Sequence, residues 1–380
     1  MRFENGVSRR SVLRVTGSSL AGLTASGLAA GDAPERVEVN VGFAGQSGRS
    51  AALGAADNVV REFDSLNIVT VEVPERAAEE LADRPDVHYV EENGRMEALA
   101  QSLSWGHDRI DAERAHRCAQ GAGADVAIID SGIDGDHPDL QPNLGSGVSI
   151  VNCNSSAAAC TYDWGDDNGH GTHCAGIVGA VNNSQGILGV APEATLHSVK
   201  VLEANGGGSY SDIASGIEYV ADRGWDVANL SLGGSWSAAV KHACQYAYTN
   251  GVLLVAAAGN SGPCYDCVGY PAAHDECIAV SATTTDDTLS AFSSQGPEIE
   301  LAAPGSDISS TYVGGGYRSL SGTSMAAPLV SGVGALLMGD PNNHPNTDAR
   351  NILCQTAQSI GLPSNESGCG LVDAEAAACY

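Results

Sequence analysis

From about Gln101 onward, nearly continuous apolar runs alternate with segments of helical spacing, such as residues 209–224. The apolar runs cover residues 126–129, 197–202, 227–232 and 252–258. Strands that are apolar along their whole length are typical of a parallel sheet that is buried on both faces. The pattern therefore predicts an α/β fold with a mainly parallel sheet. Ligands of such sheets bind at the carboxyl ends of the strands, so the residues after each run are candidates for function.

Residues 36–92 have a different pattern, which predicts a small α+β module. Period-two alternation and helical spacing follow one another in the order strand, helix, strand, helix, strand, at residues 36–43, 50–63, 67–73, 74–83 and 87–93. This order predicts a sheet with helices on one face. The next segment, 94–106, is polar and irregular and is predicted to be a linker.

The charge of the chain narrows the range of its partners. The chain has 46 acidic and 18 basic residues, a formal net charge of −28, and only two lysines, Lys200 and Lys241. Nucleic acid is not an expected partner, because phosphate binding needs a positive face. The acidic residues are scattered, and such a surface repels itself unless salt screens it. We interpret the charge as adaptation to a salty environment; an ordinary acidic exported protein is the alternative.

The N-terminal segment resembles an export signal. Arg9 and Arg10 precede a weakly apolar stretch of small residues that ends near Ala29 and Ala30, as in twin-arginine (Tat) signal peptides. The alternative is a frayed basic tail. No other segment reaches the roughly 18 apolar residues of a membrane span. We therefore expect export by the Tat pathway and no stable membrane span.

Eleven cysteines fit an oxidising compartment. Cys153 and Cys160 bracket a short loop, and Cys264 and Cys267 form an isolated C-x-x-C pair. Zinc would need a second ligand pair at matching spacing, which is not evident, so disulfides are favoured over metal. The odd number leaves at least one thiol unpaired in a monomer. Cys174 is the candidate, and one local pair is expected among Cys354, Cys369 and Cys379.

Two titratable residues stand at predicted element boundaries. Asp130 follows the run 126–129, where an aspartate can hold a histidine in one orientation; a plain Asp-Ser-Gly turn is the alternative. His170 lies between glycines at the start of a small-residue helix, where it could act as a general base. Its alternatives are helix capping and metal binding together with His173 and Cys174.

Two further polar residues complete the set of candidates. Asn260 follows the run 252–258, where its amide could donate to an oxyanion or serve only as a turn residue. Ser324 precedes a helix whose early proline, Pro328, is expected in the first turn. The helix N-terminus would favour negative charge beside the serine oxygen.

Five motifs in order resemble the subtilisin-like serine proteases: DSGID, HGTHCAG, NLSLGG, AAAGNSG and GTSMAAP. The resemblance extends from about Ala100 to the C-terminus. The export signal, acidic bias and low lysine content make the chain most similar to the halolysins of halophilic archaea, and HGTHCAG also resembles the proteinase K branch. The resemblance implies the three-layer subtilisin-like fold, with a signal peptide at 1–31, an inhibitory propeptide of ferredoxin-like fold at 32–99 and a catalytic domain at 100–380.

The family roles transfer to individual residues of this chain. Ser324 would be the nucleophile, His170 the general base, Asp130 the residue that orients His170, and Asn260 an oxyanion donor. The resemblance also implies a substrate groove with edges and a primary pocket formed by Gly207, Gly208, Ser209, Ser231, Leu232, Gly233, Ala257, Gly259 and Gly269. Ala257, Gly259 and Gly269 would form the walls and floor of the pocket, and because none of them is acidic, large apolar or aromatic substrate residues are expected before the cut.

The same resemblance implies self-processing. The propeptide would assist the folding of a sheet with nonlocal parallel pairing and then inhibit the enzyme. Cleavage after Leu99 would place Leu99 in the primary pocket and Met96 in an outer one. The expected partners are protein and peptide substrates and the chain's own propeptide, and the expected state is a monomer.

A structural calcium ion is also implied. The matching residues are Gln101, Asp139, Val181, Asn183, Gln185 and Ile187, which supply oxygen donors. An ordinary Asn-rich loop is the alternative. The chain departs from many relatives at Leu329, where they have histidine, and it ends at Tyr380 without the long extension of many halolysins.

Two other functions remain open from the sequence. One is an exported binding protein on an inactive protease scaffold, although no triad residue is missing. The other is a processing protease of narrow specificity, which would want carboxylates near Gly269; only Asp266 is close in sequence.

Overall fold

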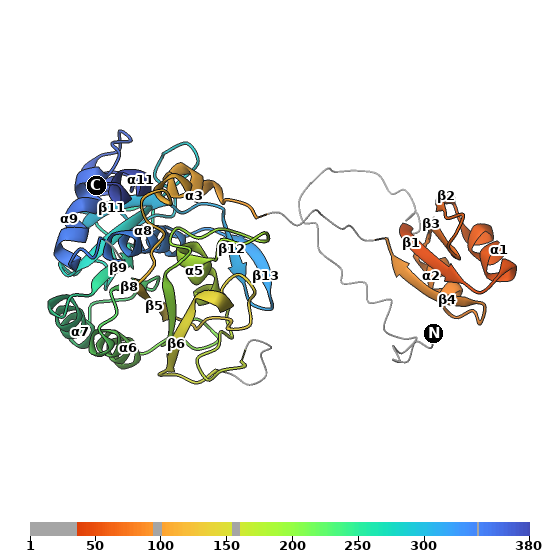
Figure 1. Cartoon of the computed structure of the whole chain (residues 1–380), viewed down its shortest axis with the longest axis horizontal. Helices are drawn as coiled ribbons and strands as arrows, with labels where there is room; N and C mark the ends of the chain where they lie inside the picture. The colour runs from red at the N-terminus through yellow and green to blue at the C-terminus, as the bar shows by residue number, and fades with distance from the viewer. Residues whose placement is uncertain (1–35, 94–100, 154–159, 340–341) are drawn as a thin grey trace. The chain divides into compact units, whose positions relative to one another are not determined.

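The computed structural model describes residues 36–93, 101–153, 160–339 and 342–380, which fall into two compact units (Figure 1). The boundary between the small and the large unit lies between residues 98 and 99. The expected signal peptide at 1–31 and the expected cleavage site, with Met96 and Leu99, lie outside the described residues.

The small unit is a four-stranded antiparallel sheet with the strand order β2-β3-β1-β4. Its elements are β1 (Arg36–Phe43), α1 (Gln46–Ala55), β2 (Asn58–Glu62), β3 (Ile68–Pro74), α2 (Glu75–Ala82) and β4 (Val87–Glu92). This βαββαβ order is the split βαβ arrangement of ferredoxin-like folds. Val41, Val71 and other buried residues of β1 and β3 form its core with Ala52 of α1 and Leu81 of α2.

The predicted helix at 50–63 is wrong over its second half. Helix α1 ends at Ala55, and residues Asn58–Glu62 form strand β2 against β3. Adjacent Val59 and Val60 are β-branched and prefer extended backbone. The edge of β3 also offers hydrogen-bond partners that the sequence pattern cannot reveal.

The large unit contains a seven-stranded sheet with the order β11-β10-β9-β8-β5-β7-β6, and every neighbouring pair is parallel. The strands are β5 (Asp125–Asp130), β6 (Leu144–Ser149), β7 (Thr195–Lys200), β8 (Val227–Leu230), β9 (Leu253–Ala257), β10 (Cys277–Thr283) and β11 (Ile299–Pro304). The α/β fold with a mainly parallel sheet is confirmed. The four predicted strands lie within two residues of their predicted ends.

Helices cover both faces of this sheet, which makes three layers (Figure 1). Alternate residues of β5 point to opposite faces: Val126 and Ile128 pack with α5 (His170–Gly179) and α8 (Thr323–Met338), and Ala127 and Ile129 pack with α6 (Tyr210–Arg223) and α7 (Ala238–Thr249). Both sets are fully buried. The uninterrupted apolar run of β5 therefore follows from burial on both faces.

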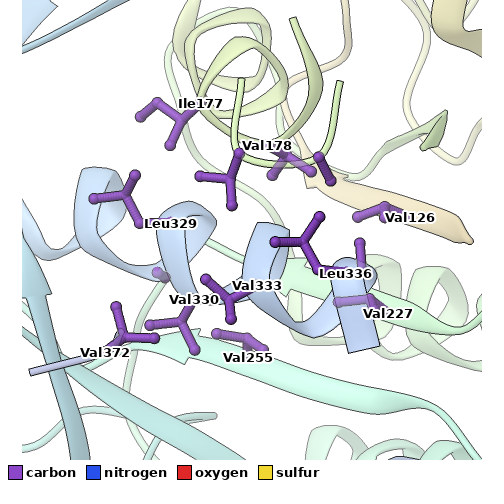
Figure 2. Close-up of a cluster of buried hydrophobic side chains, with 14 of the residues drawn as sticks. Val126, Ile177, Val178, Val227, Val255, Leu329, Val330, Val333, Leu336 and Val372 are labelled. Carbon is purple, nitrogen blue, oxygen red and sulfur yellow. The ribbon is translucent and has the colours of Figure 1, made fainter. Parts of the chain in front are cut away.

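Helix α8 runs through the centre of one of these layers. Figure 2 shows Leu329, Val330, Val333 and Leu336 of α8 between the sheet residues Val126, Val227 and Val255 and the α5 residues Ile177 and Val178. All but one residue of the helix, Ser324 at its start, are buried. Burial of this kind on all sides fixes the position of the helix N-terminus relative to the strand ends.

The remaining elements lie around the sheet. They are α3 (Trp105–Arg109), α4 (Ala112–Ala115), a 3₁₀ turn η1 (Gln141–Asn143), the antiparallel pair β12 (Ile308–Tyr312) and β13 (Gly316–Leu320), α9 (Asn346–Thr356), α10 (Ser364–Ser367) and α11 (Ala374–Ala378). The segment 94–106, predicted to be an irregular linker, runs into α3 at its end. No helix among the described residues is long and apolar enough to cross a membrane.

Four disulfides join eight of the eleven cysteines: Cys118–Cys379, Cys153–Cys160, Cys264–Cys267 and Cys354–Cys369. The predicted local pairs are confirmed, and so is a free, buried Cys174. Cys244 and Cys277 are free and buried as well, with their sulfur atoms 3.9 Å apart.

Candidate active site

Asp130 and His170 meet at the carboxyl end of β5. Asp130 is the last residue of β5 and is fully buried, and His170 is the first residue of α5. Both carboxylate oxygens of Asp130 lie 2.9 Å from Nδ1 of His170. This contact orients the ring and leaves Nε2, the other ring nitrogen, available as an acceptor.

The glycines on either side of His170 are required by the backbone. Gly169 has a φ of 101°, in the left-handed region that favours glycine. A Cβ on Gly171 would lie 2.2 Å from the carbonyl oxygen of Gly132, just after β5. The close approach of α5 to the end of β5 therefore depends on Gly171.

His170 has a raised pKa. Burial acts to lower its pKa, but the negative charge of Asp130, the hydrogen bond to Asp130 and the charge of Asp166 together outweigh burial. The His170 side chain is still 28% exposed, so protons and substrate can reach it. A histidine of raised pKa with one accessible nitrogen is suited to accept and return a proton.

Ser324 is the second residue of α8, where the helix begins beside the sheet. Pro328 lies in the second turn of α8, so its predicted place in the first turn is wrong. Proline has no N–H to donate to the carbonyl four residues earlier, which is that of Ser324. Ser231 Oγ and Cys174 Sγ donate to this carbonyl instead, at 2.8 and 3.4 Å.

The hydroxyl of Ser324 is half-buried and donates to the carbonyl of Ser231 at 3.2 Å. No hydrogen bond in the described structure joins it to His170. Cys174, one turn after His170 on α5, contacts the Ser324 carbonyl, so the two residues belong to one neighbourhood. Bonds between a nucleophile and its base are often long before substrate binds.

Asn260 faces the same helix start from beyond the end of β9. Its Oδ1 accepts hydrogen bonds from the backbone N–H and the hydroxyl of Thr323, at 2.9 and 3.1 Å. These bonds fix the orientation of the amide. Its Nδ2 donates to no other described residue and is available to a ligand.

A pocket of about 340 Å³ opens beside Ser324. Six residues predicted for the groove line it, together with Asn260 and Ser324: Ser231, Leu232, Gly233, Ala257, Gly259 and Gly269. Its other lining residues are Gly234, Ser261, Cys267 and Thr323, which the sequence did not indicate. None of the lining residues is charged, and Asp266 is not among them.

A second pocket of about 400 Å³ lies next to the first. Leu232, Gly233 and Gly234 line both pockets, and Gly208 and Ser209 close the second pocket on the other side. Apolar side chains of α6, α7 and the segment after Gly269 complete it: Tyr210, Ile213, Val240, Tyr270 and Pro271. Gly207 lines neither pocket and lies in an exposed turn, where its carbonyl accepts from Glu203 N. Ser209 is also the N-cap of α6.

The six residues expected to hold calcium lie together. Gln101 Nε2 donates to the carbonyls of Val181 and Ile187 at 2.7 and 2.9 Å, and Asn183 Nδ2 donates to buried Asp139 at 2.9 Å. Gln185 N donates to Asn183 Oδ1 at 2.7 Å. Rotating the Gln101 amide by half a turn would place its oxygen where its nitrogen now lies, beside two carbonyls. The donor set is therefore compatible with a hard cation.

The alternative metal site at His170 lacks one of its ligands. Ligand atoms of Asp130, His170 and Cys174 lie within 4.8 Å of one another, but His173 is not part of this group. His173 Nε2 instead contacts the carbonyl of Arg318 at 2.9 Å. Because Nδ1 of His170 is already bonded to Asp130, the arrangement favours proton transfer over metal binding.

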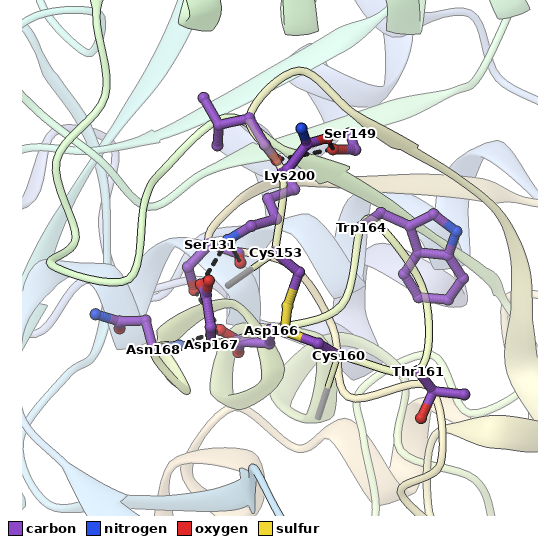
Figure 3. Close-up of a disulfide and its surroundings, with 12 residues drawn as sticks. Ser131, Ser149, Cys153, Cys160, Thr161, Trp164, Asp166, Asp167, Asn168 and Lys200 are labelled. Carbon is purple, nitrogen blue, oxygen red and sulfur yellow. Dashed lines mark hydrogen bonds and ion pairs between the residues drawn. A yellow bond between two sulfur atoms is a disulfide. The ribbon is translucent and has the colours of Figure 1, made fainter. Parts of the chain in front are cut away.

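A buried group of charges beside His170 was not predicted from the sequence. Figure 3 shows Lys200, at the end of β7, extending toward Asp167, close to the Cys153–Cys160 disulfide, with Asp166 next to them. Lys200 is fully buried and lies 2.7 Å from Asp167. A lysine inside an apolar strand run is a feature that could have indicated such a pair.

Comparisons with known proteins agree with this geometry. Residues 121–371 match the Subtilase family, peptidase family S8. The alkaline protease of Shouchella clausii is 43% identical over 321 residues, which cover 84% of this chain and 81% of that protein. Subtilisin E of Bacillus subtilis is 41% identical over 324 residues, 84% of this chain and 83% of that protein. The chain therefore belongs to the subtilase family of subtilisin-like serine proteases.

Proposed function

We propose that Asp130, His170 and Ser324 form the catalytic triad of this serine endopeptidase and that Asn260 is an oxyanion donor. The observation that supports this most is the contact of both Asp130 oxygens with His170 Nδ1, which leaves Nε2 as the base. Nε2 takes the Ser324 proton as Oγ attacks the scissile carbonyl, and Asp130 stabilises the resulting imidazolium. Nε2 then gives the proton to the leaving amine, and water hydrolyses the acyl-enzyme with the same base.

The developing oxyanion needs donors beside Ser324. Asn260 Nδ2 and the backbone N–H of Ser324 at the start of α8 would serve, because neither has a partner in the described structure. The positive end of the α8 dipole favours the same charge.

The test compares wild type with Ser324→Ala in high salt by casein hydrolysis. Ser321→Ala is a matched control, since Ser321 is an exposed serine three residues earlier whose hydroxyl bonds, among the described residues, only with Asp307. We expect Ser324→Ala to lose hydrolysis by several orders of magnitude and Ser321→Ala to keep it. Casein hydrolysis by purified Ser324→Ala would contradict the proposed triad.

We propose broad specificity with a preference for large apolar or aromatic residues before the cut. The uncharged pocket of about 340 Å³ beside Ser324 supports this, and the neighbouring apolar pocket would take an outer substrate residue. Peptide p-nitroanilides that differ only in having Phe, Leu, Glu or Lys at that position test it. A kcat/KM that is highest for Lys would instead support a processing protease of narrow specificity.

We propose that residues 32–99 are an inhibitory propeptide that is removed by cleavage after Leu99. The matched length of the relatives exceeds that of residues 101–380, so the similarity extends into the small unit. Full-length Ser324→Ala should accumulate unprocessed, and N-terminal sequencing of the wild-type product should begin at Ala100. Adding the isolated wild-type protease to this variant should restore cleavage at the same bond.

We propose that calcium stabilises the large unit through Gln101, Asp139, Asn183 and the carbonyls of Val181, Gln185 and Ile187. Bound calcium would tie residue 101 to the loop after α5. Chelation should lower the melting temperature of wild type, and calcium should restore it. In Asp139→Asn the same additions should change the melting temperature little.

We propose a monomeric enzyme that is similar to the halolysins, is exported by the Tat pathway and is adapted to high salt. The four disulfides and the net charge of −28 support an oxidising and salty environment. Replacing Arg9 and Arg10 by lysine should retain the chain inside the cell, and light scattering of the mature enzyme should give the mass of one chain.

A further inference from the structure

Asp166 accepts five hydrogen bonds although it is fully buried. Its Oδ1 accepts from Ser131 Oγ at 2.9 Å, from Asn168 N at 2.9 Å and from Gly169 N at 2.8 Å. Its Oδ2 accepts from Thr172 N at 2.9 Å and from Thr172 Oγ1 at 2.6 Å. The carboxylate thereby satisfies N–H groups at the start of α5 that have no partner within the helix.

These hydrogen bonds are part of a connection between Ser131 and Gly171, the residues that follow Asp130 and His170 in the sequence. Ser131, which follows Asp130, donates to Asp166 and accepts from Gly171 N at 3.0 Å. Gly171 follows His170. A short path of hydrogen bonds therefore runs from the end of β5 through Ser131 and Asp166 to the first turn of α5, parallel to the Asp130–His170 bond.

The loop that carries Asp166 is itself held in place. The next residue, Asp167, lies 2.7 Å from Lys200 Nζ, which also donates to the carbonyls of Ser131 and Leu202 at 2.7 and 2.9 Å. The Cys153–Cys160 disulfide lies against the carboxylate of Asp167 (Figure 3). The loop therefore holds Asp166 in a fixed position. A residue that orients another residue needs to be fixed in this way.

We infer that Asp166 is a positioning residue, which fixes the His170 ring against Asp130 by holding the start of α5 to the turn after β5. The inference rests on the proposed catalytic roles of Asp130, His170 and Ser324. Asp166 touches none of the reacting atoms. It acts through Ser131 and the backbone of residues 168–172.

The negative charge of Asp166 should also affect the pH dependence of catalysis, which can be measured. Among the described residues, the titratable groups around His170 are Asp130 at the end of β5, Asp166 before α5, His173 and Cys174 on α5, and the Lys200–Asp167 ion pair next to Asp166. Asp130 and Asp166 raise the pKa of His170, whereas burial lowers it. Because kcat/KM requires neutral His170, the acid limb of its pH profile follows this pKa. Loss of the Asp166 charge should therefore move the acid limb to lower pH.

The test is Asp166→Asn in the matured enzyme, with kcat and KM measured across pH on an apolar peptide p-nitroanilide. Rates are normalised to active sites that are titrated with a fluorophosphonate. The amide replaces one acceptor by a donor that faces other donors, so the first turn of α5 loosens. We expect kcat to fall roughly tenfold to a hundredfold with little change in KM, and the acid limb to move to lower pH.

Asp134→Asn is the matched control. Asp134 is also a buried carboxylate near the end of β5, but it accepts from Gly314 N and Asp136 N and is not among the groups that shift the pKa of His170. It should change stability without moving the acid limb. If Asp166→Asn behaved like Asp134→Asn, losing only stability, Asp166 would be structural and the inference would be wrong.

Ser131→Ala keeps the charge and covers the case in which Asp166→Asn does not fold. It breaks the path between Asp166 and Gly171, so kcat should fall while the acid limb stays in place. An unchanged kcat would overturn the inference. Failure of the catalytic roles themselves would appear differently, as peptide cleavage by Ser324→Ala.

Discussion

At the residue scale, the backbone of Ser324 depends on a proline one helical turn later. Pro328 removes the donor that the Ser324 carbonyl would have within α8. Ser231 and Cys174, from two other elements, supply donors to this carbonyl. The start of α8 is therefore tied to the strand end after β8 and to α5. The small side chain of Ser231, which lines the pocket beside Ser324, leaves room for substrate there.

Asn260 combines a structural and a chemical role that substitutions can separate. Asn260→Asp keeps the oxygen that accepts from Thr323 but loses the donor, and Asn260→Ala loses both. We expect kcat to fall roughly a hundredfold to a thousandfold in both variants, with similar KM, because the donor acts only on the oxyanion. Only Asn260→Ala should also lower the melting temperature. Steady-state kinetics and calorimetry check this, and a normal kcat in Asn260→Asp would argue against the oxyanion role.

At the element scale, the sheet could be predicted where burial on both faces makes a strand apolar throughout. This holds for the central strands β5, β8 and β9; β7 is buried as well, although His197, Ser198 and Lys200 interrupt its apolar residues. It fails for β6, an edge strand with few apolar residues, and for β2, whose strand character depends on pairing with β3. Strands β10 and β11 were not predicted either; β10 is buried along its whole length, but Ser281 and Thr283 interrupt its apolar residues. Edge strands receive part of their stability from a neighbour, and a neighbour distant in the chain leaves no mark on local periodicity.

The residues of the candidate site also differ in whether the local sequence or a distant partner determines their role. Asp130, His170, Asn260 and Ser324 stand at or shortly after strand ends or at helix starts, so local patterns could indicate them. Asp166 and the Lys200–Asp167 pair gain their importance from partners in other segments. For the same reason the pairing of Cys118 with Cys379 could not be predicted, whereas the short-range pairs could.

The disulfides should contribute unequally to stability. Cys118–Cys379 spans 261 residues and joins the segment after α4 to the end of α11, whereas Cys264–Cys267 spans three. Chain entropy gives roughly 5.6 kcal/mol for the long loop and about 2 kcal/mol for the short one. We expect the double serine variant of Cys118 and Cys379 to melt well below that of Cys264 and Cys267. Calorimetry in a Ser324→Ala background avoids self-digestion, and equal melting temperatures would contradict the prediction.

At the scale of the whole molecule, two buried histidines should limit the stability of the fold at low pH. Burial lowers the pKa of both His107 and His173 to about 4. Each Nε2 contacts a backbone carbonyl, and neither Nδ1 has a partner among the described residues. A second proton on either ring would therefore be buried without an acceptor. Between the ordinary histidine pKa near 6.5 and about 4, the unfolded chain binds more protons, so stability falls as pH falls.

Urea unfolding of the Ser324→Ala chain at several pH values tests this limit. The free energy of unfolding should decrease from pH 7 to pH 4. His107→Gln retains an amide donor for the Ile177 carbonyl but removes one titration, so its decrease over the same range should be smaller. An identical decrease in both proteins would exclude His107 as a source of the pH dependence.

The net charge of −28 makes the folded chain sensitive to ionic strength. Screening length falls from about 30 Å at 0.01 M to about 3 Å at 1 M, so salt removes long-range repulsion between acidic groups. Salt also weakens surface ion pairs, but these contribute little each and involve few of the 46 acidic residues. We therefore expect the melting temperature of Ser324→Ala to rise with sodium chloride. Potassium chloride at equal ionic strength should act alike if screening is the cause, and full stability in salt-free buffer would show that repulsion does not limit the fold.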